Sequence, residues 1–217
     1  MSYLTRDDSF YALAKMKSFH DELRSLMKKN GFDLLSNIGR RNILLSEAQE
    51  KFFTEALSRN HTVTCDGRTG EPDIMIESLE KELECKLTSR HRSGSISFQT
   101  DYETLNKKGK LDYLYVVADD SFEKFTVILY NDLTTEDFRP LSPGARGKTQ
   151  MLKHATIDRA NFLVGGLESI NDIELSKLSE KLRTASTEVQ KNKIKKSINY
   201  WETTPTKFRL IMEEINA

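Results

Sequence analysis

Asp73, Glu84 and Lys86 have the side-chain types that hydrolyse phosphodiesters with the help of a divalent cation. Asp73 follows a glycine-rich turn and opens the apolar run Ile74–Ile76. Glu84 and Lys86 lie in a second run in which every other residue is apolar, as expected of a strand with one buried face. The period of two puts Glu84 and Lys86 on the same side of that strand. If the two runs pair as a hairpin that turns at residues 77–81, Asp73 lies within reach of both side chains.

Magnesium is the cation that these residues suit. Mg²⁺ prefers hard oxygen ligands and usually takes one or two carboxylates, filling its octahedron with water and substrate phosphate. Asp73 and Glu84 are therefore enough, and we expect the backbone carbonyl of Cys85 to add an oxygen, because the pleat turns the Cys85 side chain toward the core. Bound Mg²⁺ would activate a water and stabilise charge in the transition state, while Lys86 orients the water or neutralises the phosphate.

The order of these residues resembles a known family. Glu71-Pro72-Asp73, ten intervening residues and Glu84-Cys85-Lys86 are similar to the motif of the PD-(D/E)XK nuclease superfamily. The resemblance implies that the aspartate and the glutamate bind Mg²⁺, that the lysine assists the attacking water, and that a glutamate on the preceding helix completes the site.

The segment upstream predicts such a helix over residues 46–59, with Ser46 as its N-cap. On a helical wheel Glu50 lies at the edge of the apolar face. Glu50 is therefore the first choice for the helical carboxylate, binding the metal directly or through a water, and Glu47 is the second.

Simpler interpretations compete with this one. An E-x-K triplet arises by chance in charged chains, and alternating Glu and Lys are more often a solvated strand face than a catalytic one. Glu82 shares the polar face and is either a charged neighbour or a substitute for Glu84.

Two further segments carry side chains suited to DNA. The polar loop 88–95 follows the E-x-K lysine directly, and its basic residues could clamp phosphates. The segment 140–150 only imitates the end of a phosphate-binding loop, because Ser142 replaces its first glycine, so we expect no nucleotide cofactor. Its polar side chains suit base edges instead. Ordinary surface loops remain the alternative for both segments. The predicted DNA contacts are Arg90, His91, Arg92, Gln99, Arg146, Lys148 and Gln150.

Composition limits the class of protein. The 217 residues contain 33 basic and 33 acidic side chains, which argues against an indiscriminate polycation. No segment is apolar for long enough to span a bilayer and the first residues lack a signal peptide's apolar core, so we expect a cytoplasmic protein without membrane contact. Cys65 and Cys85 lie in apolar patterns and are interpreted as reduced core residues.

The predicted fold is α/β, with a mixed central sheet flanked by helices and a helical C-terminal region. We expect an amphipathic helix over 7–29, a helix over 99–107, and strands over 112–118 and 125–130. Residues 1–165 form the core and 166–217 the helical region, packed on the same domain. Within the latter we expect a helix from 172 onward to 201 and a last helix after Pro205. The leucine stripe of this region, from Leu175 to Val189, packs on a partner helix of the same chain or forms a dimer interface.

These observations predict a Mg²⁺-dependent, sequence-specific endonuclease of double-stranded DNA. The resemblance implies a type II restriction enzyme that acts as a homodimer, each subunit cutting one strand. The alternatives are a repair or junction-resolving nuclease of the same superfamily and a non-catalytic DNA-binding module. A helical interaction protein that uses the stripe from Leu175 to Val189 is a further class. Recognition sequence, cleavage position and end polarity do not follow from one sequence.

Overall fold

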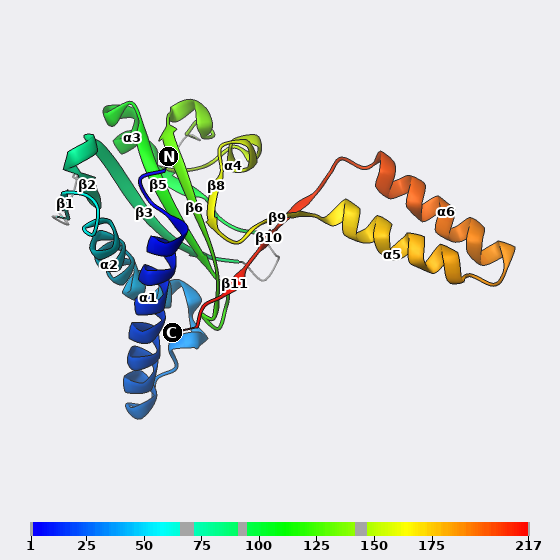
Figure 1. Ribbon diagram of the computed structural model, residues 1–217, viewed down its shortest axis with the longest axis horizontal. Coiled ribbons are helices and arrows are strands. Elements are labelled where there is room, and N and C mark those ends of the chain that lie inside the picture. The colour runs from blue at the N-terminus through cyan, green and yellow to red at the C-terminus, as the bar shows by residue number, and fades with distance from the viewer. Residues whose placement is uncertain (1, 66–71, 91–94, 142–146, 217) are drawn as a thin grey trace. The chain divides into compact units, whose positions relative to one another are not determined.

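The computed structural model describes residues 2–65, 72–90, 95–141 and 147–216 (Figure 1). The chain divides into two compact units. Unit 1 extends to Gly165 and resumes at Met212, whereas unit 2 comprises Gly166–Ile211. The chain therefore returns to unit 1 after Ile211, although the sequence suggested a single helical region from 166 to 217.

Unit 1 is built on a seven-stranded mixed sheet. Strands β3 and β5 are parallel, and the other neighbouring strands are antiparallel. Strand β6 pairs with both β8 and the short strand β11, at different residues. The α/β class with a mixed central sheet is thus confirmed. The strands lie in the order β1 (Val63–Thr64), β2 (Ile74–Ile76), β3 (Lys81–Ser89), β5 (Leu111–Ala118), β6 (Lys124–Leu133) and β11 (Glu213–Glu214), with β8 (Asn161–Val164) on β6.

Two long helices cover one face of the sheet. Helices α1 (Arg6–Lys29) and α2 (Ile38–Leu57) pack against each other, and their apolar side chains share one core with the strands. Helix α1 begins one residue before the predicted start, after a capping box between Thr5 and Asp8. The core joins Leu13, Met16, Leu45 and Phe53 of the helices to Leu114, Val116, Val127 and Leu129 of the strands.

The other face carries an aromatic layer covered by shorter elements. Helix α3 (Tyr102–Lys108), helix α4 (Lys153–Asp158) and the antiparallel ribbon of β4 (Gln99–Asp101) and β7 (Lys148–Gln150) contribute to the cover. Three tyrosine hydroxyls join the layer to these elements: Tyr113 pairs with Thr100 Oγ1 at 2.6 Å, Tyr115 donates to the Gln99 carbonyl at 2.7 Å, and Tyr130 donates to the Thr156 carbonyl at 2.8 Å.

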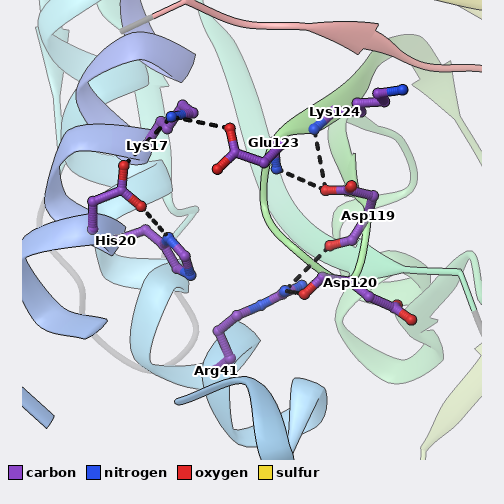
Figure 2. Close-up of polar contacts among 8 residues, drawn as sticks. Lys17, His20, Arg41, Asp119, Asp120, Glu123 and Lys124 are labelled. Carbon is purple, nitrogen blue, oxygen red and sulfur yellow. Dashed lines mark hydrogen bonds and ion pairs between the residues drawn. The ribbon is translucent and has the colours of Figure 1, made fainter. Parts of the chain in front are cut away.

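A buried arginine connects α2 to the turn between β5 and β6. The side chain of Arg41 is fully buried, and its guanidinium donates to the carbonyls of Asp119 and Asp120 at 3.2 and 2.7 Å (Figure 2). It also donates to Ser89 Oγ at 2.8 Å and lies 5.0 Å from the ring centre of Phe122. Because these contacts cross between elements, while further bonds to Asn42 Oδ1 stay within the helix, Arg41 holds α2, β3 and this turn together.

Helix α1 meets the same turn beside Arg41. The His20 ring stacks on Phe122 at 4.7 Å, and its Nδ1 lies 3.0 Å from a carboxylate oxygen of Asp21. Lys17 forms an ion pair with Glu123 at 3.0 Å, and the Asp119 carboxylate accepts the backbone N–H groups of Glu123 and Lys124 (Figure 2). We call Arg41, His20 and Phe122, with the turn that they contact, the arginine node.

Unit 2 is a helical hairpin on a two-stranded ribbon. Helices α5 (Ile170–Thr184) and α6 (Glu188–Thr203) pack on each other, and β9 (Gly166–Ser169) pairs with β10 (Phe208–Ile211). Buried Asn171 joins the parts, because its amide donates to the carbonyls of Trp201 and Thr204 and accepts the N–H of Lys207. Leu175, Leu178 and Leu182 of the predicted stripe are partly buried on α5, which packs on α6.

Several local predictions are wrong. Helix α2 begins at Ile38 with Asn37 as its N-cap, and Ser46 lies inside it, donating to the Ile43 carbonyl at 2.8 Å. The predicted helix over 172–201 is broken before Glu188, which places Val189 on α6 with 81% of it exposed. The segment after Pro205 is strand β10, because it pairs with β9. Cys65 is exposed, whereas Cys85 is buried as expected.

Candidate active site

The hairpin of β2 and β3 brings Asp73 to Glu84. Ile74 pairs with Leu83. The next residue away from the turn is Asp73, just before β2, on one side and Glu84 of β3 on the other, so these two residues lie opposite each other. The backbone N–H of Cys85 donates to Asp73 Oδ2 at 2.7 Å, which fixes the carboxylate beside β3. The structure thus brings together the two carboxylates that the sequence proposed as metal ligands.

Strand β3 has an open edge where these residues lie. Strand β2 pairs with Lys81, Glu82 and Leu83, while β5 pairs with Leu83–Ser89 on the opposite side. Within the part of the chain that the structure describes, Glu84–Ser89 therefore has a strand neighbour on one side only. We call this side the open edge of β3. An extended ligand can approach the site there.

Lys86 pairs with Glu84 across one pleat of the strand, and both side chains are partly buried. Burial lowers the pKa of the Lys86 ammonium, but the charge and hydrogen bond of Glu84, followed by the charge of Asp73, outweigh it and leave this pKa raised. Lys86 is therefore a stable cation at neutral pH. It can neutralise a phosphate or orient a water, but it does not suit the role of a general base.

Glu50 reaches this cluster from α2. The helix is anchored by the neighbouring Gln49, whose buried amide donates to the Leu114 carbonyl at 3.2 Å. Burial, then the charge of Asp73, and also the charges of Glu47 and Glu84, raise the pKa of Glu50 to about 7, while Lys86 opposes the shift. Glu50 is half-buried, whereas Glu47 is exposed.

Like charges dominate the cluster. Burial raises the pKa of Asp73, as does the charge of Glu84, with Lys86 and the Cys85 N–H acting against it. Burial and the carboxylates also raise the pKa of the Cys85 thiol, so this cysteine is not a nucleophile. Three neighbouring carboxylates face one ammonium, and a cation placed among them would relieve their repulsion.

The residues fit Mg²⁺ by their donor chemistry. Among the described residues, no group of three or more His, Cys, Asp or Glu side chains forms a ready metal cluster. Mg²⁺ does not need such a cluster, because one or two carboxylates with waters and a substrate phosphate suffice. Asp73 and Glu84 would hold it, with the Cys85 carbonyl beside them and Glu50 contributing directly or through a water.

The tyrosines of the aromatic layer lie beside Glu84 and Lys86 on the neighbouring strand β5. Tyr113 pairs in register with Glu84, and Tyr115 with Lys86, so these four side chains share one face of the sheet. Burial raises the pKa of both tyrosine hydroxyls, which are already hydrogen-bonded to the β4 segment. They are therefore structural, and they limit water on the inner side of the cluster.

The predicted DNA contacts fall into separate places. Gln99 is in strand β4 and not in a helix, and Lys148 and Gln150 are in strand β7 and not in a loop. The ribbon places Gln99 opposite Gln150, whose amide also donates to Ser97 Oγ at 2.7 Å. Arg90 follows the end of β3. Three of these predicted contacts lie outside the described residues: His91, Arg92 and Arg146.

A pocket of about 910 Å³ adjoins the open edge, and sequence reasoning missed most of it. Arg90 and Gln99, which the sequence proposed separately, both line it. Its other walls come from the start of α2 and from Asp120 in the turn after β5. No local pattern marks these residues, because they belong to segments far apart in the chain.

No protein family model matches this chain, and no curated protein sequence is significantly similar to it. None of the described helices has both the length and the apolar content to cross a membrane.

Proposed function

We propose that the protein is a Mg²⁺-dependent endonuclease of the PD-(D/E)XK type that cleaves double-stranded DNA. The observation that carries this proposal is the approach of Asp73, Glu84 and Lys86 at an open strand edge, with Glu50 of α2 near enough for their charges to shift its pKa. Carboxylates that raise each other's pKa beside a protonated lysine form a site for a cation and a phosphate together.

Each residue has a role in this mechanism. Asp73 and Glu84 would hold the cation, and the Cys85 N–H keeps Asp73 in place. Lys86 donates to a phosphate oxygen or to the attacking water. Glu50, once its proton is lost to solvent, would orient the attacking water. Mg²⁺, when bound, would supply the positive charge that activates this water and stabilises the pentacovalent transition state.

The biological role that we propose is that of a type II restriction enzyme in the cytoplasm. Restriction of duplex DNA requires two cuts, so we propose a homodimer in which each subunit cuts one strand. A repair or junction-resolving nuclease would use the same site but select DNA by shape. A DNA-binding module without activity would have no need of the Lys86 and carboxylate arrangement.

The test is cleavage of plasmid and phage DNA with MgCl₂ or with EDTA. We expect discrete fragments with MgCl₂, and we expect Asp73→Asn to lower the rate by roughly 100-fold or more, since it removes ligand charge while preserving shape. The matched control is Glu82→Gln, because Glu82 lies in the same strand but pairs with Lys108 at 2.8 Å.

Each outcome decides between the candidates. Discrete fragments support a restriction enzyme, and nicking confined to branched or damaged DNA supports the repair alternative. Wild-type rates in Asp73→Asn would disprove the metal assignment. Loss of cleavage in Glu82→Gln with normal rates in Glu84→Gln would move the ligand to Glu82. No cleavage of any substrate would disprove the nuclease proposal.

A further inference from the structure

The pocket beside the open edge shares its two main walls with the proposed active site. Strand β3 carries Lys86 and then the pocket-lining residues Thr88, Ser89 and Arg90. Thr88 lies on the same face as Lys86, two residues further along. At about 3.3 Å per residue, Ser89 lies roughly 10 Å beyond Lys86 along the strand. The pocket is therefore within a few nucleotides of a phosphate held at Lys86.

Helix α2 forms the other wall and runs in the opposite direction to β3. The start of the helix, at Asn37 and Ile38, lines the pocket, whereas Glu50 reaches the active site. Asn42 Nδ2 donates to Ser89 Oγ at 3.2 Å, which locks the two walls at the level of the pocket. The two sites thus lie along one pair of elements.

The pocket wall contains polar side chains that are not engaged in side-chain hydrogen bonds among the described residues. The Gln99 amide and the Asp120 carboxylate have no side-chain hydrogen-bond partner among the described residues, although both line the pocket. The backbone of Asp120 is fixed, because its carbonyl accepts from Arg41 at 2.7 Å, while its carboxylate points away from that guanidinium (Figure 2). The backbone position of Asp120 in the pocket wall is thus set before any ligand arrives.

These groups suit a nucleobase better than a bare phosphate. A free carboxylate repels phosphate, whereas it accepts hydrogen bonds from the N–H groups of a base. Gln99 supplies a donor and an acceptor, Arg90 a cation, and Leu35 and Ile38 an apolar surface for the flat faces of the base. About 910 Å³ is within the size range of small-molecule pockets and exceeds what a phosphate ion needs.

We propose that this pocket takes one nucleotide of the substrate strand, turned out of the duplex near the cleaved bond. The inference rests on the proposed nuclease function for the identity of the strand. An unpaired nucleotide at this position has already lost its stacking and pairing, so DNA that carries one binds more tightly than perfect duplex. A free nucleotide has the same base chemistry, but it does not benefit from the neighbouring Lys86.

The test is binding of two 20-base-pair duplexes in EDTA, one perfect and one with a single unpaired 2-aminopurine. Measuring without Mg²⁺ separates binding from chemistry. We expect the wild type to bind the second duplex about tenfold more tightly and to change the 2-aminopurine fluorescence. Asp120→Asn should remove most of this preference. Asp158→Asn should retain it, because Asp158 is also exposed but lies on α4, outside the pocket.

Equal affinity for the two duplexes, or an unchanged preference in Asp120→Asn, would overturn the inference. If millimolar deoxynucleoside monophosphates displace neither duplex, and the duplex with the unpaired base is still bound more tightly, the pocket takes a nucleotide of the DNA strand. Binding of the monophosphates without any preference between duplexes would overturn it in favour of a free nucleotide. A retained preference in a protein that never cleaves DNA would support the pocket while disproving the nuclease proposal, so the two failures are distinguishable.

Discussion

The arginine node lies near the start of α2 and the open edge of β3 lies near its middle. Both regions contain charged side chains, but these charges have different partners. Arg41 is fully buried and donates to two backbone carbonyls and to Ser89 Oγ. Its charge is thus dispersed over fixed acceptors. At the open edge Asp73, Glu84 and Glu50 share one ammonium, Lys86.

This difference separates a structural cluster from a functional one. A buried cation with all its donors engaged holds elements together and needs no further partner. Neighbouring carboxylates that raise each other's pKa cost stability until a cation arrives. The comparison predicts that substitutions at the node change stability and that substitutions at the open edge change activity.

The largest effect should follow Lys86→Ala. Without the ammonium, a phosphate at the site loses its charge partner, so we expect the cleavage rate to fall roughly 100-fold or more. The measurement is the initial rate at saturating MgCl₂. The control is Lys108→Ala, which removes only the ion pair with Glu82. A twofold loss in Lys86→Ala would reduce Lys86 to a surface lysine.

The next effect is on stability and belongs to the node. Arg41→Met keeps an unbranched side chain but leaves the carbonyls of Asp119 and Asp120 without their donor. We expect a loss of about 2 to 4 kcal/mol in the free energy of unfolding, measured with urea. Arg40→Ala is the control, because Arg40 is exposed, and its cost should be within about 0.5 kcal/mol. Equal costs for the two variants would contradict a structural role for the node.

A smaller effect concerns the pH dependence of Glu50. Its pKa is about 7 in the folded protein and 4.5 ordinarily, so between these values the folded state holds the proton more tightly. Stability without metal therefore falls as pH rises from 4.5 through 7. Glu50→Gln should flatten this slope in the thermal midpoint. In the wild type, Mg²⁺ should bind more tightly above pH 7 than below it, because below pH 7 binding must first displace the proton of Glu50. A pH-independent midpoint in the wild type would contradict the shift.

The smallest effect has the opposite sign and belongs to His20. Burial lowers the pKa of this histidine below 6.5, with Asp21 opposing and Arg41 assisting the shift. The contribution of neutral His20 is complete above pH 6.5 and is lost as the pH falls through the folded pKa. His20→Gln should weaken this acid sensitivity, whereas His154→Gln should not, because His154 is exposed on α4. Equal acid slopes in both variants would remove His20 from the explanation.

The active-site residues could be predicted because their signals are local. The alternation around Glu84 and Lys86 and the short turn after Ile76 are sufficient to predict a hairpin, although the predicted turn included Lys81, which pairs with Ile76 in the structure. Helix α1 and strands β5 and β6 have equally strong local patterns. Glu50 could be placed on a helix although the start of α2 was wrong, since a helical face depends on spacing and not on where the helix begins.

The remaining features depend on partners that are distant in the chain. Gln99–Asp101 became a strand because it pairs with Lys148–Gln150, and the segment after Pro205 because it pairs with β9. Tertiary pairing overrode local propensity in both cases. The pocket combines the start of α2, the end of β3 and Asp120, whose positions depend on Arg41 and Ser89. The sequence by itself determined the chemistry of the carboxylates and the lysine, whereas only long-range packing decided which groups lie beside them.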